Sequence, residues 1–289
     1  MRAEPPIKIH WRPCGQEGSG DAAAFAELCG CAEALGFESV QIPPTADLRD
    51  ALAVAIATGL KITRLKFRIG APFETVLSSL FGREMKEAWA ILGKRLIFHM
   101  SFNAAEATAR KGIFIQAGEF LTNCRKLFDP SECPEFDVEG ESAETAFLGI
   151  KQGDCLWRLP NRPSQVYADA LPVLHFGKKV GLLSSVVARE THEEAHDAAA
   201  FTLTDIGADR LDNSAAWLTP SLWRSDSLAF DRPAALIGSF EEIAAAIHGF
   251  RRAGIFQYLV RGGPEGRDIE IFGRNVLPRI RAMEEASTS

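Results

Sequence analysis

The stretch that decides the fold is ALIGSFEEIAAAIHGFRRAGIFQYLVRGGPEGRDIEIFGRNVLPRIR, residues Ala235 to Arg281. Ser239 followed by Glu242 has the spacing of a helix capping box. Apolar residues then recur at helical spacing as far as Phe250. Gly254 takes the place of the glycine that ends a helix. The first half of the stretch therefore predicts a capped amphipathic helix.

The second half predicts a strand and a last helix. The apolar run Ile255–Val260 has strand length, and Gly262-Gly263-Pro264 interrupts it. The last helix is expected from about Asp268 to Leu277-Pro278. Arg261 lies just past the strand, where α/β folds place their chemistry.

The rest of the chain repeats this alternation of apolar run and helical pattern. Together with the run above, it gives eight strands and no low-complexity linker, which predicts a (β/α)8 barrel in a single domain spanning 1–289. A doubly wound open sheet is the alternative, but no G-x-G-x-x-G follows an early strand. An insertion is expected at about 204–230, packed over the barrel mouth or against a partner subunit. The other predicted strands are Ile7–Trp11, Ser39–Ile42, Leu65–Ile69, Leu96–Ser101, Phe136–Val138, Cys155–Arg158 and Leu182–Val187.

Composition narrows the class of protein. A chain of 289 residues with 46% hydrophobic and 24% charged residues is typical of a soluble globular protein. The sequence has no membrane-length apolar run and no signal-peptide core, so a cytoplasmic location is expected. A net charge of −6 without a basic stripe disfavours nucleic acid as the partner. Six cysteines in a chain of this length favour free thiols over a disulfide framework, and Cys124 and Cys133 have no second pair to complete a zinc site.

The residue pattern of the C-terminal stretch resembles that of a known family. An L-[IV]-G-S opening, a helix, an A-G-I joint, a strand and F-G…V-L-P-R-I are similar to the C-terminus of luciferase-like flavin-dependent monooxygenases, most of all the alkanesulfonate monooxygenase branch. Gly181–Ala195 and Phe73–Phe102 agree with that frame. The resemblance implies a (β/α)8 barrel that binds reduced FMN supplied by a separate flavin reductase. It further implies that dioxygen is the co-substrate, that a small or carrier-bound organic substrate is oxidised, and that the chain forms a homodimer.

The chain departs from the family where the relatives keep their chemistry. Their seventh strand carries an arginine and, two residues on, a histidine, which align with Leu183 and Ser185. Their second-strand cysteine aligns near Leu48, their first-strand histidine near Cys14, and their threonine-glycine after strand four with Phe102-Asn103. These replacements keep an alternative open, in which the barrel has lost flavin chemistry and acts as a non-redox enzyme or a binding or partner protein.

Catalytic candidates follow from the rule that barrel enzymes work at the carboxyl ends of their strands. His99, Arg158, Ser185 and His10 are the predicted catalytic residues, with His99 the acid–base candidate by residue type. Each can instead be a barrel-lining residue. The other polar or aromatic residues at strand ends are Arg12, Gln41, Arg68, Ser101, Glu139, Trp157, Ser184 and Arg261.

Cofactor-binding candidates lie in two turns. Gly140-Glu141-Ser142 joins a strand to a helix, so its backbone N–H groups and the Ser142 hydroxyl can face an anion. The resemblance implies that this turn contacts the flavin phosphate. Arg261-Gly262-Gly263 follows the last strand, where barrels often hold phosphate, and Ser101 completes the predicted cofactor-binding set. An ordinary capping turn is the alternative for both.

One motif suggests a metal. His192-Glu193-Glu194-Ala195-His196 satisfies H-E-x-x-H, which places two imidazoles on one helix face. No third ligand follows, since Asp205 and Asp209 fall in a predicted loop. A solvated acidic helix start is the favoured interpretation, and no metal is predicted.

Overall fold

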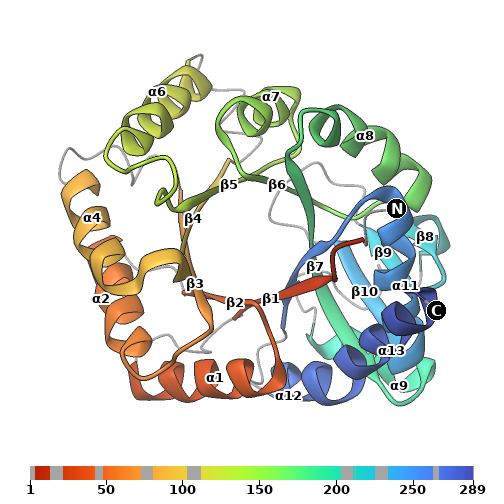
Figure 1. The fold of residues 1–289 in the computed structure, drawn as a ribbon. Coiled ribbons are helices and arrows are strands. Elements are labelled where there is room, and N and C mark those ends of the chain that lie inside the picture. The colour runs from red at the N-terminus through yellow and green to blue at the C-terminus, as the bar shows by residue number, and fades with distance from the viewer. Residues whose placement is uncertain are drawn as a thin grey trace.

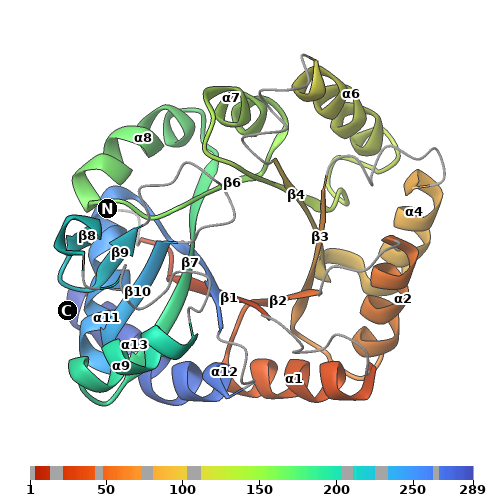
Figure 2. The same ribbon diagram turned by 180° about the vertical axis from the view of Figure 1, so that it is seen from behind.

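The computed structural model describes residues 4–13, 22–42, 48–72, 81–102, 112–202, 211, 213–224, 234–262 and 267–288. Parallel strands form a closed ring with helices around it (Figures 1 and 2). The last of these strands pairs with the first on one side and with β7 on the other, which closes the barrel. The predicted (β/α)8 barrel is therefore confirmed. Its strands are β1 Lys8–Arg12, β2 Ser39–Ile42, β3 Lys66–Pro72, β4 Leu96–Ser101, β5 Glu135–Glu139, β6 Cys155–Arg158, β7 Lys179–Arg189 and β11 Gln257–Arg261.

The helices form the outer layer, and both termini lie on the same flank (Figures 1 and 2). Apolar side chains on their inner faces pack against outward-facing strand residues in one large core. The helices are α1 Ala22–Leu35, α2 Leu48–Gly59, α4 Phe81–Leu92, α6 Ile113–Arg125, α7 Ala143–Gln152, α8 Pro163–His175, α9 His192–Thr202, α11 Phe240–Gly249, α12 Asp268–Ile271 and α13 Leu277–Thr288.

Alternation along each strand separates an apolar outer face from a polar inner one. On β5, Phe136 and Val138 join the core between strands and helices. Glu135, Asp137 and Glu139 have the opposite orientation, because successive strand residues point to opposite faces. The sequence thus places acidic residues inside the barrel.

Strand β7 is long enough to pair with both β11 and β10. Its first part, Gly181–Ser185, pairs with β11 inside the barrel, and its last part, Ser185–Arg189, pairs with β10. Strand β10 (Ala234–Ser239) pairs on its other edge with β9 of an antiparallel hairpin, so a small side sheet extends from the barrel wall (Figure 1). The hairpin strands are β8 Trp217–Thr219 and β9 Leu222–Arg224, in the described part of the expected insertion.

The C-terminal stretch confirms two local predictions and corrects two. Ser239 and Glu242 form the capping box, and Gly254 is left-handed at φ 77° after a 3₁₀ turn. The residues before Ser239, predicted only as the opening of the helix, are strand β10. The last helix does not end at Leu277-Pro278: it continues through α13, because a π turn over 272–276 widens the helix just where proline lacks its N–H.

Candidate active site at the carboxyl end of the barrel

An arginine and a glutamate meet across the barrel at its carboxyl end. Arg12 ends β1 and Glu139 ends β5, and Arg12 Nη2 lies 2.5 Å from Glu139 Oε2. Arg12 Nε also donates to Gln41 Oε1 at 2.5 Å. The Arg12 side chain is 21% exposed and the Glu139 side chain 6%, so the arginine forms the upper edge of this contact.

His99 lies directly beneath this pair. Its Nδ1 is 3.1 Å from Arg68 Nη1, and its Nε2 contacts the Glu139 carboxylate. A guanidinium only donates hydrogen bonds, so Nδ1 accepts and Nε2 carries the hydrogen that Glu139 accepts. Burial lowers the pKa of His99, and together with the charges of Arg68 and Arg12 it outweighs the raising effect of Glu139. His99 is therefore neutral, in a fixed tautomer.

Glu139 is held in its charged form. Burial alone raises the pKa of a carboxyl group. Here the Arg12 charge and the hydrogen bond from His99 outweigh burial, and the pKa of Glu139 is lowered strongly. One carboxylate thus fixes both the arginine above it and the histidine below it.

His10 lies deeper in the barrel. Its Nδ1 is 2.7 Å from Ser39 Oγ, its Nε2 is 2.8 Å from Gln257 Oε1, and its ring is edge-on to Trp157 at 5.4 Å. Burial and the charge of Arg68 lower the pKa of His10 well below its usual value. Both ring nitrogens are occupied by neighbours in the barrel wall.

A buried ion pair completes the interior. Arg68 and Asp137 are 1% and 2% exposed and form an ion pair. Trp157 Nε1 donates to Asp137 Oδ2 at 2.8 Å, and the Arg68 guanidinium lies 4.7 Å from the centre of the indole. A buried pair of this kind is costly to break, because the remaining partner would keep an uncompensated charge. Asp137 is not among the residues predicted from the sequence, although the alternation of acidic and apolar residues in Glu135–Glu139 indicates it.

A small apolar cluster lies beside this polar network. Cys155, Trp157, Leu183 and Leu259 form a separate buried cluster. Leu183, which aligns with the relatives' arginine, is thus part of an apolar wall. The cluster adjoins the polar network through Trp157, which also donates to Asp137.

Arg261 and Ser185 lie side by side at the mouth. They are register partners on β11 and β7, and Arg261 is also the register partner of Arg12 on β1. Among the residues that the structure describes, Arg261 has no carboxylate partner. Ser101, half-buried, lies opposite Glu139 in the register of β4 and β5. The predicted residues Arg261, Ser185 and Ser101 therefore share one end of the barrel with Arg12.

The predicted phosphate turn is engaged in local structure. The Ser142 hydroxyl caps α7 by accepting from the backbone N–H of Thr145 at 3.1 Å. A side chain at Gly140 would meet Thr145 at 2.8 Å, which gives this glycine a packing role. Arg158 Nη1 donates to the Glu141 carbonyl at 2.5 Å. Arg158 lies on the outer face of β6, since its neighbour Trp157 faces inward, and it is not brought together with His99.

The remaining predicted residues have simpler surroundings. Gly262 is buried against the Trp11 ring, which a side chain at this position would overlap. Gly263 lies outside the described residues, as do Cys14 and Asn103, two of the positions where the chain differs from the family that its sequence resembles.

The H-E-x-x-H motif starts helix α9. His192 Nδ1 is 3.0 Å from Glu242 Oε2, and the His196 ring stacks on Trp217 with ring centres 6.1 Å apart. In the parts of the chain that the structure describes, no group of three or more His, Cys, Asp or Glu side chains is arranged to hold a metal ion.

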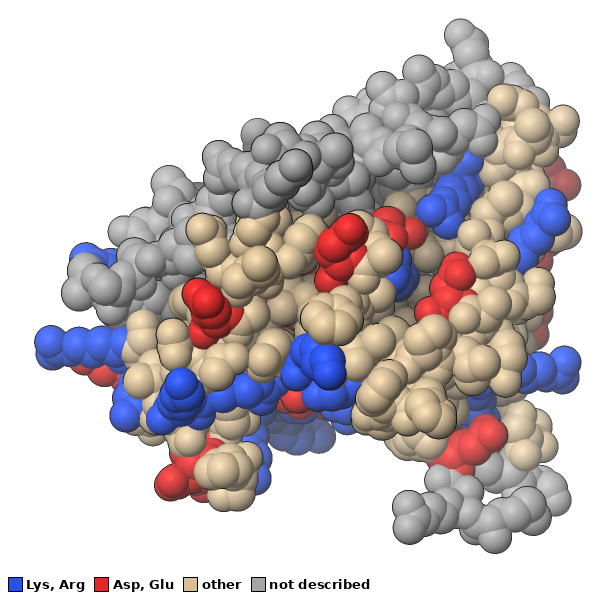
Figure 3. Space-filling view, turned by 90° about the horizontal axis from the view of Figure 1, so that it is seen from above, with Lys and Arg blue, Asp and Glu red and all other residues tan. Residues whose placement is uncertain are grey.

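The charge distribution on the described surface does not point to a particular large partner. On the face in Figure 3, the basic and acidic side chains of the described residues are intermixed and neither gathers into one patch. Within the described ranges, no helix combines the length and apolar character that a membrane crossing requires.

Solved structures with the same fold are similar over nearly the whole chain. An EDTA monooxygenase from Chelativorans sp. BNC1 is 12% identical, with a TM-score of 0.73, over 96% of this chain and 94% of that one. A riboflavin lyase, solved with modified FMN and its substrate riboflavin, is 14% identical, with a TM-score of 0.71, over 96% and 92%. A coenzyme F420 dependent tetrahydromethanopterin reductase from Methanopyrus kandleri is 11% identical, with a TM-score of 0.65, over 96% and 100%. No protein-family model matches the chain, and no curated protein matches it. What these likenesses establish is the fold: the chain is a (β/α)8 barrel of the kind that these enzymes share.

Proposed function

We propose that the chain is a reduced-FMN-dependent monooxygenase and a divergent member of the luciferase-like family. It would bind the flavin at the carboxyl end of the barrel and oxidise a small or carrier-bound organic substrate with dioxygen. The observation that carries the proposal is the mouth of the barrel, where Arg261 lies beside Arg12 and, among the residues that the structure describes, has no carboxylate partner. The fold shared with a monooxygenase and with an FMN-containing lyase supports it. Assignment to the alkanesulfonate monooxygenase branch stays a prediction.

The donors at the mouth fit a flavin phosphate in their chemistry. A guanidinium that no carboxylate neutralises is suited to binding a phosphate group through charge-assisted hydrogen bonds. Arg261 would supply that group, with the Ser185 hydroxyl beside it in the register of β7 and β11. Ser142 would add its hydroxyl hydrogen while its oxygen continues to cap α7.

The chain's own part would be to hold polar groups still while the cofactor reacts. Reduced FMN, when bound, would supply the electrons that activate dioxygen. Arg12, fixed by Gln41 and Glu139, would orient a carbonyl or anionic group of the substrate over the mouth. His99 would keep Glu139 and Arg12 in place, and a proton-transfer role for His99 would have to pass through Glu139, because both its ring nitrogens are occupied.

Two partners belong to the same proposal. A separate flavin reductase would deliver reduced FMN, and the chain would form a homodimer. Light scattering of the protein as it elutes from a size-exclusion column tests the homodimer. The expected mass is twice the 31.5 kDa of one chain, and the mass of a single chain would contradict the dimer.

A single-turnover experiment tests the function. Reduced FMN is premixed with protein without oxygen, then mixed with aerated buffer while flavin absorbance is followed. The proposal predicts that oxidised flavin appears at a different rate in the presence of the protein than in a solution of free reduced FMN. Arg261→Ala should abolish that change, whereas Arg267→Ala, an exposed arginine before α12, should retain it. Oxidation at the rate of free flavin with the wild-type protein would contradict the proposal.

One observation favours a second candidate function. Leu183, where the relatives carry an arginine, lies in a buried apolar cluster with Trp157 and Leu259. A barrel that had lost flavin chemistry, and acts as a non-redox enzyme or a binding or partner protein, would fill this position with such a residue. Failure to bind oxidised or reduced FMN would favour this second candidate.

A further inference from the structure

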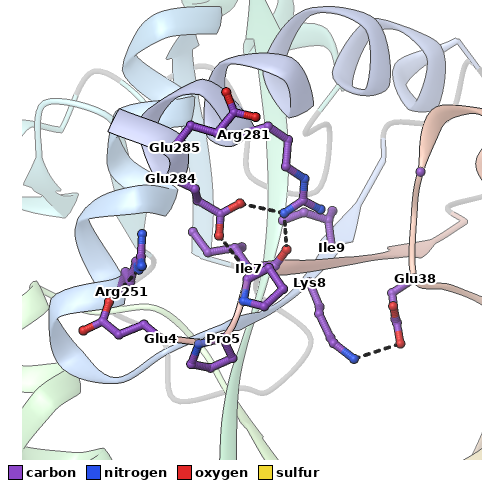
Figure 4. A pocket seen from close by; sticks show the side chains of 12 residues that line it. Glu4, Pro5, Ile7, Lys8, Ile9, Glu38, Arg251, Arg281, Glu284 and Glu285 are labelled. Carbon is purple, nitrogen blue, oxygen red and sulfur yellow. Dashed lines mark hydrogen bonds and ion pairs between the residues drawn. The ribbon is translucent and has the colours of Figure 1, made fainter. Parts of the chain in front are cut away.

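A cavity lies at the amino-terminal end of the barrel, opposite the candidate active site (Figure 4). Its volume is about 440 Å³, and it is bounded by residues 4–9, by Arg251 after helix α11, and by helix α13. Lys8, which begins β1, lines it, whereas Arg12 at the other end of β1 belongs to the candidate active site. The cavity is therefore separate from the site proposed for flavin.

Arg251 is the cation in this cavity with unused hydrogen-bond donors. It is 8% exposed, and among the described residues its Nη1 is buried without a hydrogen-bond partner. Its Nε is in ion-pair contact with Glu4 Oε2 at 2.8 Å. The Glu4 side chain is 61% exposed. A buried guanidinium is thus compensated by one carboxylate that is itself mostly in water, an arrangement that leaves the buried charge poorly satisfied.

The other cations of the cavity are already paired. Lys8 Nζ is 3.1 Å from Glu38 Oε1. Arg281 Nη1 donates to Glu284 Oε2 at 2.7 Å and to the Ile7 carbonyl at 2.6 Å. Figure 4 shows these pairs on different sides of the cavity from Arg251 and Glu4. An incoming anion would therefore bind at Arg251.

The walls limit the chemistry of that anion. Pro5 and Pro6, both exposed, supply an apolar surface in the cavity, and three carboxylates besides Glu4 line it, those of Glu38, Glu284 and Glu285. A dianion such as phosphate would be repelled by these carboxylates at short range. A monoanion with a short apolar chain would match both the arginine and the apolar wall.

We propose that this cavity is a binding site for a small organic monocarboxylate. The ligand carboxylate would take the place of Glu4 on Arg251, and its aliphatic part would lie on the side chains of Pro5 and Pro6. Glu4 is then a built-in competitor, because it presents the same chemical group to the same guanidinium. Ligand binding would release Glu4 from Arg251.

Calorimetric titration of the whole chain with sodium butyrate tests the proposal, with butyramide as the uncharged control. Glu4→Gln removes the competitor and should tighten butyrate binding by about fivefold, the value of a half-exposed ion pair. Arg251→Met should abolish binding. The neighbouring exposed Arg252→Met is the matched control and should bind as the wild type does.

Several outcomes would overturn the proposal. These are no butyrate binding by Glu4→Gln, equal loss of binding in Arg251→Met and Arg252→Met, or binding of butyramide as tight as that of butyrate. Binding of inorganic phosphate as tight as butyrate would overturn the carboxylate assignment. Arg251→Lys guards against misfolding of the methionine variant, since it keeps the charge and should bind more weakly than wild type but measurably. Because the cavity is at the other end of the barrel, none of these results depends on FMN.

Discussion

At the scale of single residues, Glu139 is the carboxylate that joins the two halves of the polar network, Arg12 above and His99 below. Glu139→Gln keeps the shape but removes the charge, which leaves Arg12 without its ion pair. We expect the free energy of unfolding in urea to fall by about 3 kcal/mol. The exposed Glu193→Gln is the control and should change stability little. An equally small effect of Glu139→Gln would contradict the assigned role.

The two buried histidines make the free energy of unfolding depend on pH. Their pKa values are lowered in the folded state, by burial first, so the unfolded chain binds protons more readily. Their contribution is therefore fully present above the ordinary value of 6.5 and is lost as pH falls below it. Each histidine should add a slope of about 1.4 kcal/mol per pH unit to the free energy of unfolding below that point. His10→Gln should remove the slope that one histidine contributes, as measured by urea unfolding at several pH values. Replacement of the exposed His175 by glutamine should not remove it.

The sequence predicts which residues lie at strand ends better than it predicts the face of the strand to which each side chain points. The strand-end rule nominated His10, His99 and Ser185, and the structure has all of them on the inner face of the barrel. Arg158 ended a predicted strand too, yet it lies on the outer face. The run Cys155–Arg158 is only four residues long, and cysteine, leucine and tryptophan are all apolar, so no alternation shows which face its last residue takes.

At the scale of elements, two serine caps form a matched pair. Ser142 caps α7 and Ser239 caps α11, each accepting from a backbone N–H three residues on. Replacement of either serine by alanine should cost about 1 kcal/mol of stability, seen as a lower urea midpoint. Only Ser142→Ala should also weaken binding of reduced FMN. Equal FMN affinity in the two variants would leave Ser142 as a helix cap and nothing more.

The elements that sequence reasoning missed are those set by distant contacts. Strand β10 precedes a strong capping box, and nothing local indicates that these residues pair with the end of β7 and with the hairpin strand β9. Likewise, Pro278 predicts a helix end, but the preceding π turn lets the chain continue as helix α13. The barrel strands, by contrast, are short apolar runs between turn residues and were predicted from that pattern.

At the scale of the whole molecule, a chain of ion pairs spans the amino-terminal end of the barrel. Lys66 joins Glu38 and Glu135 at 3.1 Å each, and Lys179 joins Glu135 at 3.2 Å. Burial raises the pKa of Glu135, but the two lysines outweigh it and lower the pKa to about 2. This contribution to stability is present above the ordinary value of 4.5 and is lost as pH falls toward 2. Glu135→Gln should therefore lower the urea midpoint at pH 6 and lessen its fall in acid, whereas an unchanged acid dependence would exclude this role.

The measurement that tests the central claim most directly is an anaerobic titration of the whole protein with reduced FMN, followed by tryptophan fluorescence. Oxidised FMN and coenzyme F420 are titrated in parallel, because the fold is shared with an F420 dependent reductase as well. We predict saturable binding of reduced FMN, weakened about tenfold or more by Arg261→Ala and unchanged in Arg267→Ala. Saturable binding of F420 alone would move the proposal to that cofactor, and no binding of any of the three would contradict a flavin-type enzyme on this barrel.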